Sequence, residues 1–431
     1  MKQFDFITEI PTLGKAKIKS PLRKARFVDG SSPTSLMLTS GELTELDADV
    51  LQKDFEKAGP REHIYFDAAK ARCAIVTCGG ICPGINDVIR AIVHEAHYHY
   101  GVRHVLGITN GLRGFIPKYG YDIRELTPDA VSHIHQFGGT ILGSSRGLQD
   151  PVEIVDSLER LNINVLFVIG GDGAMRAAKS IVNEISLRKR NIAVIGIPKT
   201  IDNDINFITR SFGFDTAVEK AAEVIQCAHV EATGMDMGVG LVKLMGREAG
   251  FIAAQATLAM QEVNFLLVPE QPFALTGEGG LLQAVETRLK ERKHSIIVCA
   301  EGAGQDLLGG EPERDPSGNP KLGDICGRIV SELEEYARVK NFEVNIKFID
   351  PSYLIRSVPA NASDRVYCGF LGQNAVHAAM AGKTGMVVSR LKSSMVHLPL
   401  DLVATKRRHI NTSSDWWASV MEATGQRDFL K

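Results

Sequence analysis

The sequence lacks any long apolar run and any large excess of one charge. No stretch reaches the roughly 18 uninterrupted apolar residues of a membrane-spanning helix, and the opening residues, MKQFDFITEIPTLGKAKIK, contain no apolar signal core. The formal net charge is −2 at pH 7. Because nucleic acids and anionic membranes are bound through a large positive field, we expect neither as a partner. We therefore expect a soluble, cytoplasmic protein whose ligands bind in local pockets.

Cysteine and tryptophan set further limits. The 7 cysteines are an odd number scattered in or beside apolar runs, which is typical of reduced thiols rather than of a disulfide framework. Cys78 and Cys82 lack the second pair of ligands that a zinc site would need. The twin Trp416 and Trp417 are expected to pack a C-terminal tail, and the basic runs RLKERKH and TKRRH to be solvated or at a subunit contact.

The apolar residues that are present predict an α/β fold. A chain of 431 residues exceeds what one hydrophobic core usually organises, so we expect two domains. Short runs rich in Val and Ile recur, separated by stretches with helical spacing: CAIVTC, HVLGIT, VLFVIGG, IAVIGIP, GVGLVKLM, SIIVCAEG, IKFID and GMVVS. Strands without polar alternation belong to parallel sheets that are covered on both faces. We expect two doubly wound lobes, with ligands at the carboxyl ends of their strands.

Glycine-rich turns follow two of these predicted strands. GGICPGIND follows CAIVTC, and GGDGAMRAA follows VLFVI. Glycine lets backbone amides approach a phosphate, and the amino terminus of the next helix favours negative charge. Neither turn has the G-x-G-x-x-G pattern, and AGKTG at 381–385 fails as a phosphate loop because His377 stands where the first glycine belongs. The paired turns predict a phosphate site of another kind.

The stretch PKTIDNDI, at 198–205, follows a third strand, IAVIG. Asn and Asp favour turns, so one interpretation is a simple surface turn. The other is a catalytic site, since Asp202 and Asp204 could divide proton transfer and metal binding between them. Asp172 in GGDG could bind Mg²⁺ through its oxygens, or it could cap the next helix.

Seven motifs in order, over roughly residues 71–405, are similar to those of the 6-phosphofructokinase family: CGGICPGIN, GGTILGSSRG, VIGGDGAMRAA, PKTIDNDI, GFDTAVE, KLMGREAGFIA and VPANASDR. The sequences of these motifs resemble those of the longer, ATP-dependent branch of the family, which has an N-terminal extension. The resemblance implies two Rossmann-like lobes and a dimer or tetramer. It places an extension at 1–70, a donor lobe at 71–210 plus 358–405, a sugar-phosphate lobe at 211–357 and a tail at 406–431 that packs on the second lobe.

The family reaction moves the terminal phosphoryl group of ATP to the 1-hydroxyl of fructose 6-phosphate with Mg²⁺. The resemblance implies that Asp202 is the general base, with Thr200 and Arg247 also catalytic, and that Asp172 and Asp204 serve the metal. The implied donor-binding residues are Gly79, Gly80, Arg146, Gly171, Asp172, Gly173, Ala174 and Lys199. The implied substrate-binding residues are Thr200, Ile201, Asp202, Met245, Gly246, Arg247, Glu301, Lys347, Tyr353 and Arg356.

Two positions depart from the shorter bacterial-type enzymes, which have phosphate-binding arginines where this chain has Gly238 and Lys347. Lys243, or a basic residue from a neighbouring subunit, would supply the missing charge. The donor is also ambiguous, because Lys199 is the residue that pyrophosphate enzymes carry, whereas Gly173 leaves room for the α-phosphate of a nucleotide. We expect ATP, with pyrophosphate as the alternative.

Two further alternatives stay open. GGDG also occurs in NAD kinases and diacylglycerol-type lipid kinases, although those families lack the ordered PKTIDND and MGR pair. A catalytically silent sugar-phosphate sensor is the alternative outside enzymes. The intact Asp172, Asp202 and Arg247 favour an enzyme.

Overall fold

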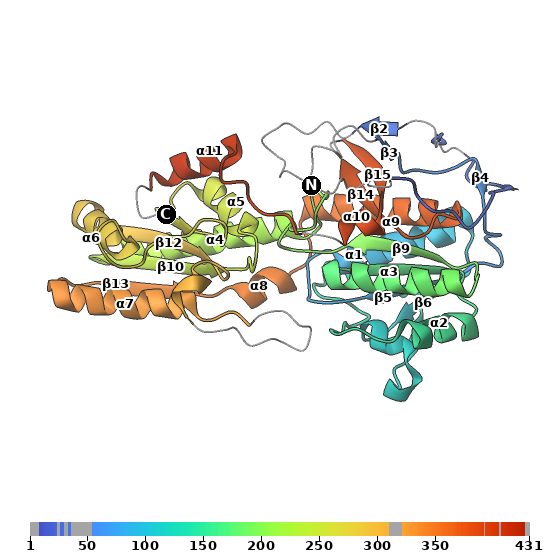
Figure 1. Ribbon diagram of the computed structural model, residues 1–431, viewed down its shortest axis with the longest axis horizontal. Coiled ribbons are helices and arrows are strands. Elements are labelled where there is room, and N and C mark those ends of the chain that lie inside the picture. Colours follow the sequence, from blue (N-terminus) through green and yellow to red (C-terminus); the bar gives the residue numbers. More distant parts are fainter. Residues whose placement is uncertain are drawn as a thin grey trace, which may run out of the picture.

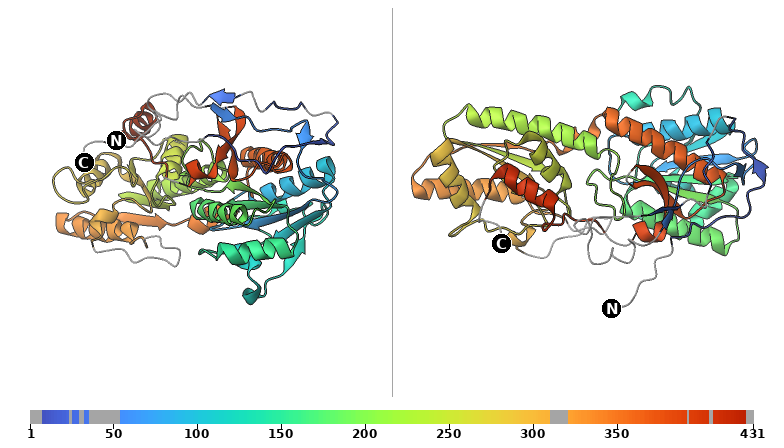
Figure 2. Two further views of the ribbon diagram at one scale, coloured as in Figure 1. Left: turned by 45° about the vertical axis from the view of Figure 1, so that its right-hand side comes forward. Right: turned by 90° about the horizontal axis from the view of Figure 1, so that it is seen from above.

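Two α/β lobes lie side by side along the longest axis of the computed structural model (Figure 1). The structure describes residues 8–23, 26–29, 33–35, 54–309, 321–391, 393–404 and 407–426, so the predicted extension at 1–70 and the tail at 406–431 fall partly outside the described residues. Seen from above, the lobes remain distinct (Figure 2). The predicted α/β fold class, with mainly parallel sheets, is confirmed.

The first lobe is built on a seven-stranded sheet with the order β15-β14-β9-β8-β5-β6-β7. Its five central strands are parallel, and β15 and β7 pair antiparallel at the two edges. The strands are β5 (Arg72–Thr77), β6 (His104–Ile108), β7 (Ile123–Glu125), β8 (Val165–Gly170), β9 (Ala193–Pro198), β14 (Met386–Leu391) and β15 (Ser394–Pro399). The chain passes from β5 to β6 on one side and then to β8 on the other. This reversal puts a topological switch point between β5 and β8, where ligands bind in such sheets.

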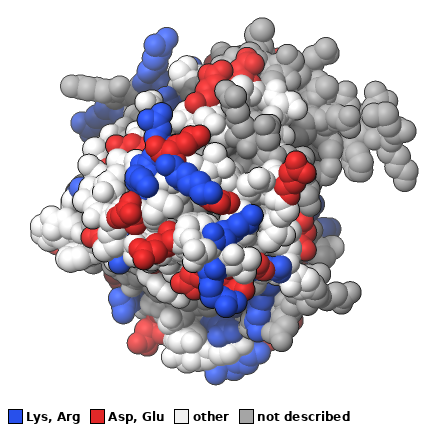
Figure 3. Space-filling view, turned by 90° about the vertical axis from the view of Figure 1, so that its left-hand side faces the viewer, with Lys and Arg blue, Asp and Glu red and all other residues white. Residues whose placement is uncertain are grey.

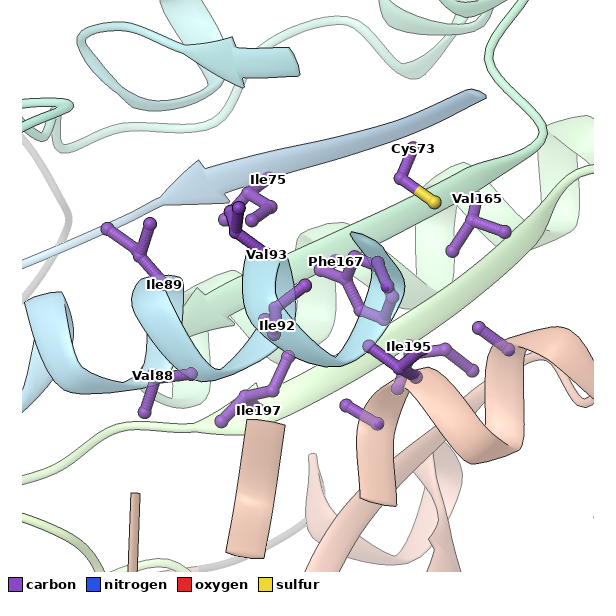
Figure 4. Packing of buried hydrophobic residues seen from close by; sticks show 14 of the residues in the cluster. Cys73, Ile75, Val88, Ile89, Ile92, Val93, Val165, Phe167, Ile195 and Ile197 are labelled. Atoms are coloured by element: carbon purple, nitrogen blue, oxygen red, sulfur yellow. The ribbon is translucent and has the colours of Figure 1, made fainter. Parts of the chain in front are cut away.

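Helices cover both faces of this sheet. They are α1 (Ile85–His94) and α9 (Ala362–Met380) on one face, α2 (Pro151–Arg160) and α3 (Asp172–Leu187) on the other, and the short α10 (Leu400–Val403). Apolar residues of α1 recur with helical spacing, and Figure 4 shows them facing side chains of β5, β8 and β9. Ile89 and Ile92, for example, are fully buried. Each such side chain contributes about 1.5–3 kcal/mol of burial free energy.

The second lobe has a parallel sheet of four strands with the order β11-β12-β10-β13. These are β10 (Gly238–Leu244), β11 (Phe265–Leu267), β12 (His294–Ala300) and β13 (Asn345–Ile349). The helices α4 (Phe214–Thr233) and α5 (Phe251–Met260) pack on one face, and α6 (Leu281–Arg292) and α7 (Ile325–Lys340) on the other. The short α8 (Ser352–Ser357) follows β13.

The tail helix α11 (Asp415–Thr424) packs on α5 of the second lobe, where the ring of Trp416 lies 6.2 Å from that of Phe251. All strands of the second sheet lie between residues 210 and 357, and all strands of the first sheet lie outside this range. We keep 210 and 357 as our proposal for the domain limits. The remaining elements are β1 (Ile18–Lys19), β2 (Pro33–Ser35), β3 (Asp54–Glu56), β4 (His63–Ile64), the π-helix η1 (Glu95–Tyr100) and the 3₁₀ turns η2 (Gly111–Phe115), η3 (Pro117–Tyr119), η4 (Ile134–Gln136) and η5 (Gln305–Leu307).

The outer end of the second lobe carries both signs of charge (Figure 3). On α6, Lys290 Nζ lies 2.6 Å from Glu286 Oε1, and on α7 Arg338 Nη2 lies 2.6 Å from Glu335 Oε1. Such exposed pairs between successive helical turns stabilise by a few tenths of a kcal/mol each. Lys290, within the basic run RLKERKH, is therefore solvated as expected.

The cysteines form no disulfide, and all of them except Cys227 are buried. This agrees with the expectation of reduced, apolar thiols. Among the helices of the described ranges, none is both long and apolar enough to cross a bilayer.

A nearly buried carboxylate fastens the N-terminal segment to the first lobe. Glu56, at the end of β3, lies 2.7 Å from Arg61 Nη2 and 2.8 Å from Lys383 Nζ, and its Oε1 lies 3.6 Å from His397 Nδ1 on β15. Burial alone would raise the pKa of Glu56, but His397, Lys383 and Arg61 together outweigh burial and hold the pKa well below its usual range. The folded state therefore favours the ionised carboxylate.

Glu56→Gln is expected to lower the free energy of unfolding by roughly 3 kcal/mol at pH 7, because it leaves nearly buried cations without their counter-charge. Since the folded-state pKa of Glu56 is depressed, the contribution is complete above its ordinary pKa of 4.5 and is lost as the pH falls below it. Urea unfolding of the two proteins should thus differ at pH 7 and converge in acid. Glu335→Gln, in the exposed pair on α7, is the control; an equal loss there would contradict the argument.

Candidate active site

A cavity of about 910 Å³ lies where the carboxyl ends of strands from both lobes meet. From the first lobe it is lined by residues that follow β5, β8 and β9, including Gly79, Asp172 and Asp202. From the second it is lined by residues that follow β10 and β12, including Arg247 and Glu301. The switch point between β5 and β8 therefore opens into this cavity. Clefts of this size between lobes are typical of small-molecule sites.

Nearly all of the sequence-predicted site residues line this one cavity. They are Gly79, Gly80, Arg146, Gly171, Asp172, Gly173, Ala174, Lys199, Thr200, Ile201, Asp202, Asp204, Met245, Arg247, Glu301, Tyr353 and Arg356. Gly246 lies between two lining residues with a φ of +137°, which favours glycine, and a Cβ there would meet Ala249 O at 2.7 Å. Gly246 therefore shapes the turn that presents its neighbours.

Lys347, another predicted substrate-binding residue, lies away from the cavity. It lies in the middle of β13, the edge strand of the second sheet, and is not among the residues that line the cavity. The strand continues to Ile349, so the carboxyl end that faces the cavity comes later, at Asp350. In this single chain, the direct-contact role predicted for Lys347 is therefore not supported by its position.

The stretch PKTIDNDI is a closed loop rather than a simple surface turn. Asn203 is buried, with a left-handed φ of 55°, and its Oδ1 accepts a hydrogen bond of 2.9 Å from Ser211 N. The hydroxyl of Thr200 donates to Asp204 Oδ1 over 2.6 Å and accepts from Asp202 N over 3.2 Å. These local bonds fix the backbone, so the loop holds Asp202 in a defined position at the cavity wall.

Asp202 has the electrostatic environment of a proton acceptor. Burial raises the pKa of its carboxyl group, with Asp204 and Glu301 acting in the same direction, against the nearby cations Arg407 and Lys199. Its Oδ1 is shielded from water and has no hydrogen-bond partner among the described residues. A carboxylate with a raised pKa and an unused oxygen at a cavity wall is suited to take a proton from a hydroxyl group.

Asp172 opens helix α3, whose amino terminus lines the cavity through Gly171 to Ala174. Burial raises the pKa of Asp172, and the carboxylates of Asp204 and Glu248 add to the effect, although Arg176 Nη2 lies 2.8 Å from Asp172 Oδ2 and opposes it. The carboxylates near the start of α3 repel one another, which favours a cation between them. The free amides at the amino terminus of α3 favour a phosphate group.

The carboxylates fit Mg²⁺ that arrives with phosphates. Among the described residues, no group of three or more His, Cys, Asp or Glu side chains could hold a metal ion. Mg²⁺ is usually bound by only one or two carboxylates, with phosphate oxygens and water completing its shell. Asp172 and Asp204, which lie near enough for Asp204 to raise the pKa of Asp172, provide that smaller set.

The opposite wall of the cavity carries cations suited to an anionic ligand. Arg247 and Lys243 lower the pKa of Glu301, which burial would otherwise raise further. Lys243 Nζ lies 3.1 Å from Asp350 Oδ2, and both residues line the cavity. Arg356 stacks over the ring of Tyr353 at 4.7 Å. The wall therefore combines fixed cations with carboxylates that can accept hydrogen bonds from hydroxyl groups.

The glycine at 238 has a packing reason. It begins β10, and a Cβ at this position would lie 2.0 Å from Ala232 O, which belongs to the backbone of α4. A larger side chain cannot enter without moving the helix. Lys243, which lies at the other end of β10 and lines the cavity, is the cation that the same strand supplies.

Sequence reasoning missed three charged residues of the cavity wall: Arg176, Asp350 and Arg407. The expectation that TKRRH is solvated or at a subunit contact is wrong for Arg407, whose Nη1 lies 2.8 Å from Glu248 Oε1. Its neighbour Arg408 stacks over Phe251 at 4.6 Å. Nothing in the local sequence signals this position, because it depends on where the chain returns after α10.

The fold and the cavity define a two-lobed α/β protein whose interlobe cavity is lined by glycine-rich turns, carboxylates and cations. A family model described as phosphofructokinase matches residues 72–379. An ATP-dependent 6-phosphofructokinase of Borreliella burgdorferi is 49% identical over 383 residues, which make up 87% of this chain and 86% of that protein. The chain therefore belongs to the phosphofructokinase family.

Other relatives agree. An ATP-dependent 6-phosphofructokinase of Amycolatopsis methanolica is 45% identical over 434 residues, covering 96% of this chain and 94% of its own length. Among solved structures, a pyrophosphate-dependent phosphofructokinase from Marinobacter aquaeolei shares the fold with a TM-score of 0.68 at 20% identity, covering 83% of this chain and 93% of that one. The second likeness concerns the fold alone.

Proposed function

We propose that this chain is an ATP-dependent 6-phosphofructokinase, which transfers the terminal phosphoryl group of Mg-ATP to the 1-hydroxyl of fructose 6-phosphate. The observation that carries the proposal is that Asp172 and Asp202, from one lobe, and Arg247 and Glu301, from the other, line a single cavity. One bound pair of substrates could thus contact the proton acceptor Asp202, the donor-side carboxylate Asp172 and the sugar-side cation Arg247.

The proton step belongs to Asp202. In phosphoryl transfer, the bond between the terminal phosphorus and the departing ADP breaks as the new P–O bond forms, and the acceptor oxygen loses its proton. A carboxylate whose pKa is raised by burial takes that proton more readily than an ordinary surface carboxylate. Thr200 holds the loop by its bonds to Asp202 and Asp204, so its catalytic contribution is to position the base.

On the donor side, backbone and cations receive the polyphosphate. Gly79 and Gly80, after β5, and Gly171 to Ala174, at the start of α3, offer backbone without obstructing side chains. Arg146 and Lys199 line the same part of the cavity and neutralise developing charge. Asp172 and Asp204 would hold Mg²⁺, which when bound neutralises charge on the phosphate oxygens.

On the sugar side, Arg247, Lys243 and Arg356 are the cations for the phosphate of the sugar, and Glu301 accepts hydrogen bonds from its hydroxyl groups. A homodimer or homotetramer would allow a neighbouring subunit to add a basic residue where this chain has Gly238. A cytoplasmic location belongs to the same proposal, as expected for an enzyme of glycolysis.

A donor-swap assay tests the proposal. Purified protein with fructose 6-phosphate and Mg²⁺ is expected to consume ATP and to form fructose 1,6-bisphosphate, because Gly173 leaves the donor wall open. Turnover with pyrophosphate but not with ATP would identify pyrophosphate as the donor. The buried Lys199 of the cavity, a residue that pyrophosphate enzymes carry, would then be the better guide to the donor. Binding of the sugar phosphate without turnover would favour the silent sensor, and NAD and diacylglycerol are the control acceptors.

A further inference from the structure

Residues 407–410, which we call the interlobe strap, cross between the lobes beside the cavity. On the first lobe, Arg407 forms an antiparallel bridge with Ile205, and Arg408 N donates to Asp204 O over 2.7 Å. These are backbone contacts, so they do not depend on flexible side chains. The strap is thus fixed directly to the loop that carries the proposed base and metal ligand.

On the second lobe, the strap contacts the turn that carries Arg247. His409 Nδ1 donates to Glu248 O over 2.8 Å, and Ile410 N donates to Glu270 Oε1 over 2.9 Å. The same Glu270 oxygen accepts from Gly250 N over 3.1 Å. Glu248 follows Arg247 directly, so four residues of the strap span from the loop with Asp204 to the turn with the sugar-side arginine.

The guanidinium group of Arg407 makes the same connection through charge. Its Nη1 lies 2.8 Å from Glu248 Oε1, on the second lobe, and 3.8 Å from Asp204 Oδ2, on the first. The side chain is only 25% exposed and lines the cavity. One cation therefore bridges the donor-side carboxylate and the residue next to Arg247, at the cavity wall where both substrates are proposed to bind.

We propose that Arg407 is a positioning residue that couples the donor site to the sugar-phosphate site. The inference rests on the proposed function. A ligand that holds the carboxylate of Asp204 in place also holds the guanidinium group of Arg407, and through Glu248 it orders the side chains of the turn with Arg247. Binding of one substrate thus lowers the ordering cost of the other, so the coupling is positive and reciprocal.

The experiment measures binding of fructose 6-phosphate by titration calorimetry, with and without Mg²⁺ and a non-hydrolysable ATP analogue. For the wild-type protein we expect the analogue to tighten sugar-phosphate binding by about five-fold or more, the lower range of coupling between sites. Arg407→Met and, separately, Glu248→Gln are expected to bring this ratio below about two-fold. The double variant should add little to either change, as for two residues of one interaction.

Two further variants separate coupling from stability. Arg407→Lys keeps the charge without the planar fork, so we expect it to restore an intermediate ratio. Arg188→Met is the matched control, because Arg188 joins Glu184 of α3 to Asp156 of α2 at 2.7 and 2.5 Å, away from the cavity lining. It removes an equivalent two-carboxylate bridge and should leave the ratio at the wild-type value.

A wild-type ratio near one, or a full ratio retained in both Arg407→Met and Glu248→Gln, would overturn the inference. The catalytic assay supplies an independent reading, since loss of coupling should raise the KM for each substrate measured at saturation with the other more than it lowers kcat. The two proposals fail differently. An inactive wild-type protein contradicts the proposed function. An active protein whose affinity ratio, with and without the ATP analogue, is unchanged by substitution of Arg407 contradicts the coupling alone.

Discussion

Asp202→Asn is expected to lower kcat by roughly 10²–10⁴-fold, the range for loss of a positioned general base. An amide cannot take the proton that the acceptor hydroxyl loses, yet it has nearly the shape of the carboxylate. Because the role proposed for Asp202 is proton transfer and not phosphate binding, the KM for the donor should change much less. Initial rates over a matrix of both substrate concentrations separate kcat from the two KM values.

The same substitution should not unfold the protein. In the wild type, Asp202 Oδ1 is shielded from water without a partner among the described residues, and burial raises the pKa of the carboxyl group. Replacing the charge by a neutral amide removes that electrostatic cost, so the melting temperature should be unchanged or slightly higher. Asp401→Asn, which removes the ion pair between Asp401 of α10 and Lys179 of α3, is the control for kcat. Wild-type turnover by Asp202→Asn would assign the base elsewhere.

Most of the site could be predicted because it follows from one rule. Residues after buried parallel strands gather at one edge of a sheet. In the sequence, one predicted strand is followed by glycine and a carboxylate in GGDG, and another by carboxylates and asparagine in PKTIDND. The predicted strands that lead to these two motifs are present as β8 and β9. Three strands of the two main sheets do not follow from the apolar runs: β7 and β11, which have three residues each, too few to show a hydrophobic period, and the edge strand β15.

Lys347 and Arg407 show where sequence reasoning stops. The resemblance matches Lys347 to a phosphate-binding arginine of the shorter enzymes, which assumes that β13, the following turn and α8 keep the same lengths as in those enzymes. Arg407 was overlooked because its role comes from a crossing between lobes. Its partners Asp204 and Glu248 are about 200 and 160 positions earlier in the chain, and no local pattern encodes such a meeting.

Gly173→Asp should raise the KM for ATP by roughly 10²–10³-fold. The resemblance places the α-phosphate of the nucleotide beside this glycine, and two like charges about 4 Å apart cost on the order of 4 kcal/mol at an effective dielectric constant near 20. The fold has room for the new side chain, since a Cβ at Gly173 would meet nothing within 4 Å. An acidic residue in the first turn of α3 is also favourable for the helix. A higher KM for ATP would therefore result from repulsion of the nucleotide and not from misfolding.

Companion variants decide whether charge or size is responsible. Gly173→Asn has nearly the bulk of Asp without its charge, so it should retain most of the ATP affinity if repulsion is the cause. Gly369→Asp, on α9, is the control for placing an aspartate in an open helical position, since a Cβ there also meets nothing within 4 Å. Because pyrophosphate has no α-phosphate with a nucleoside attached, the ratio of ATP to pyrophosphate activity should fall in Gly173→Asp alone. An unchanged KM for ATP would mean that the nucleotide does not pass Gly173, and the choice of donor would then rest on Lys199.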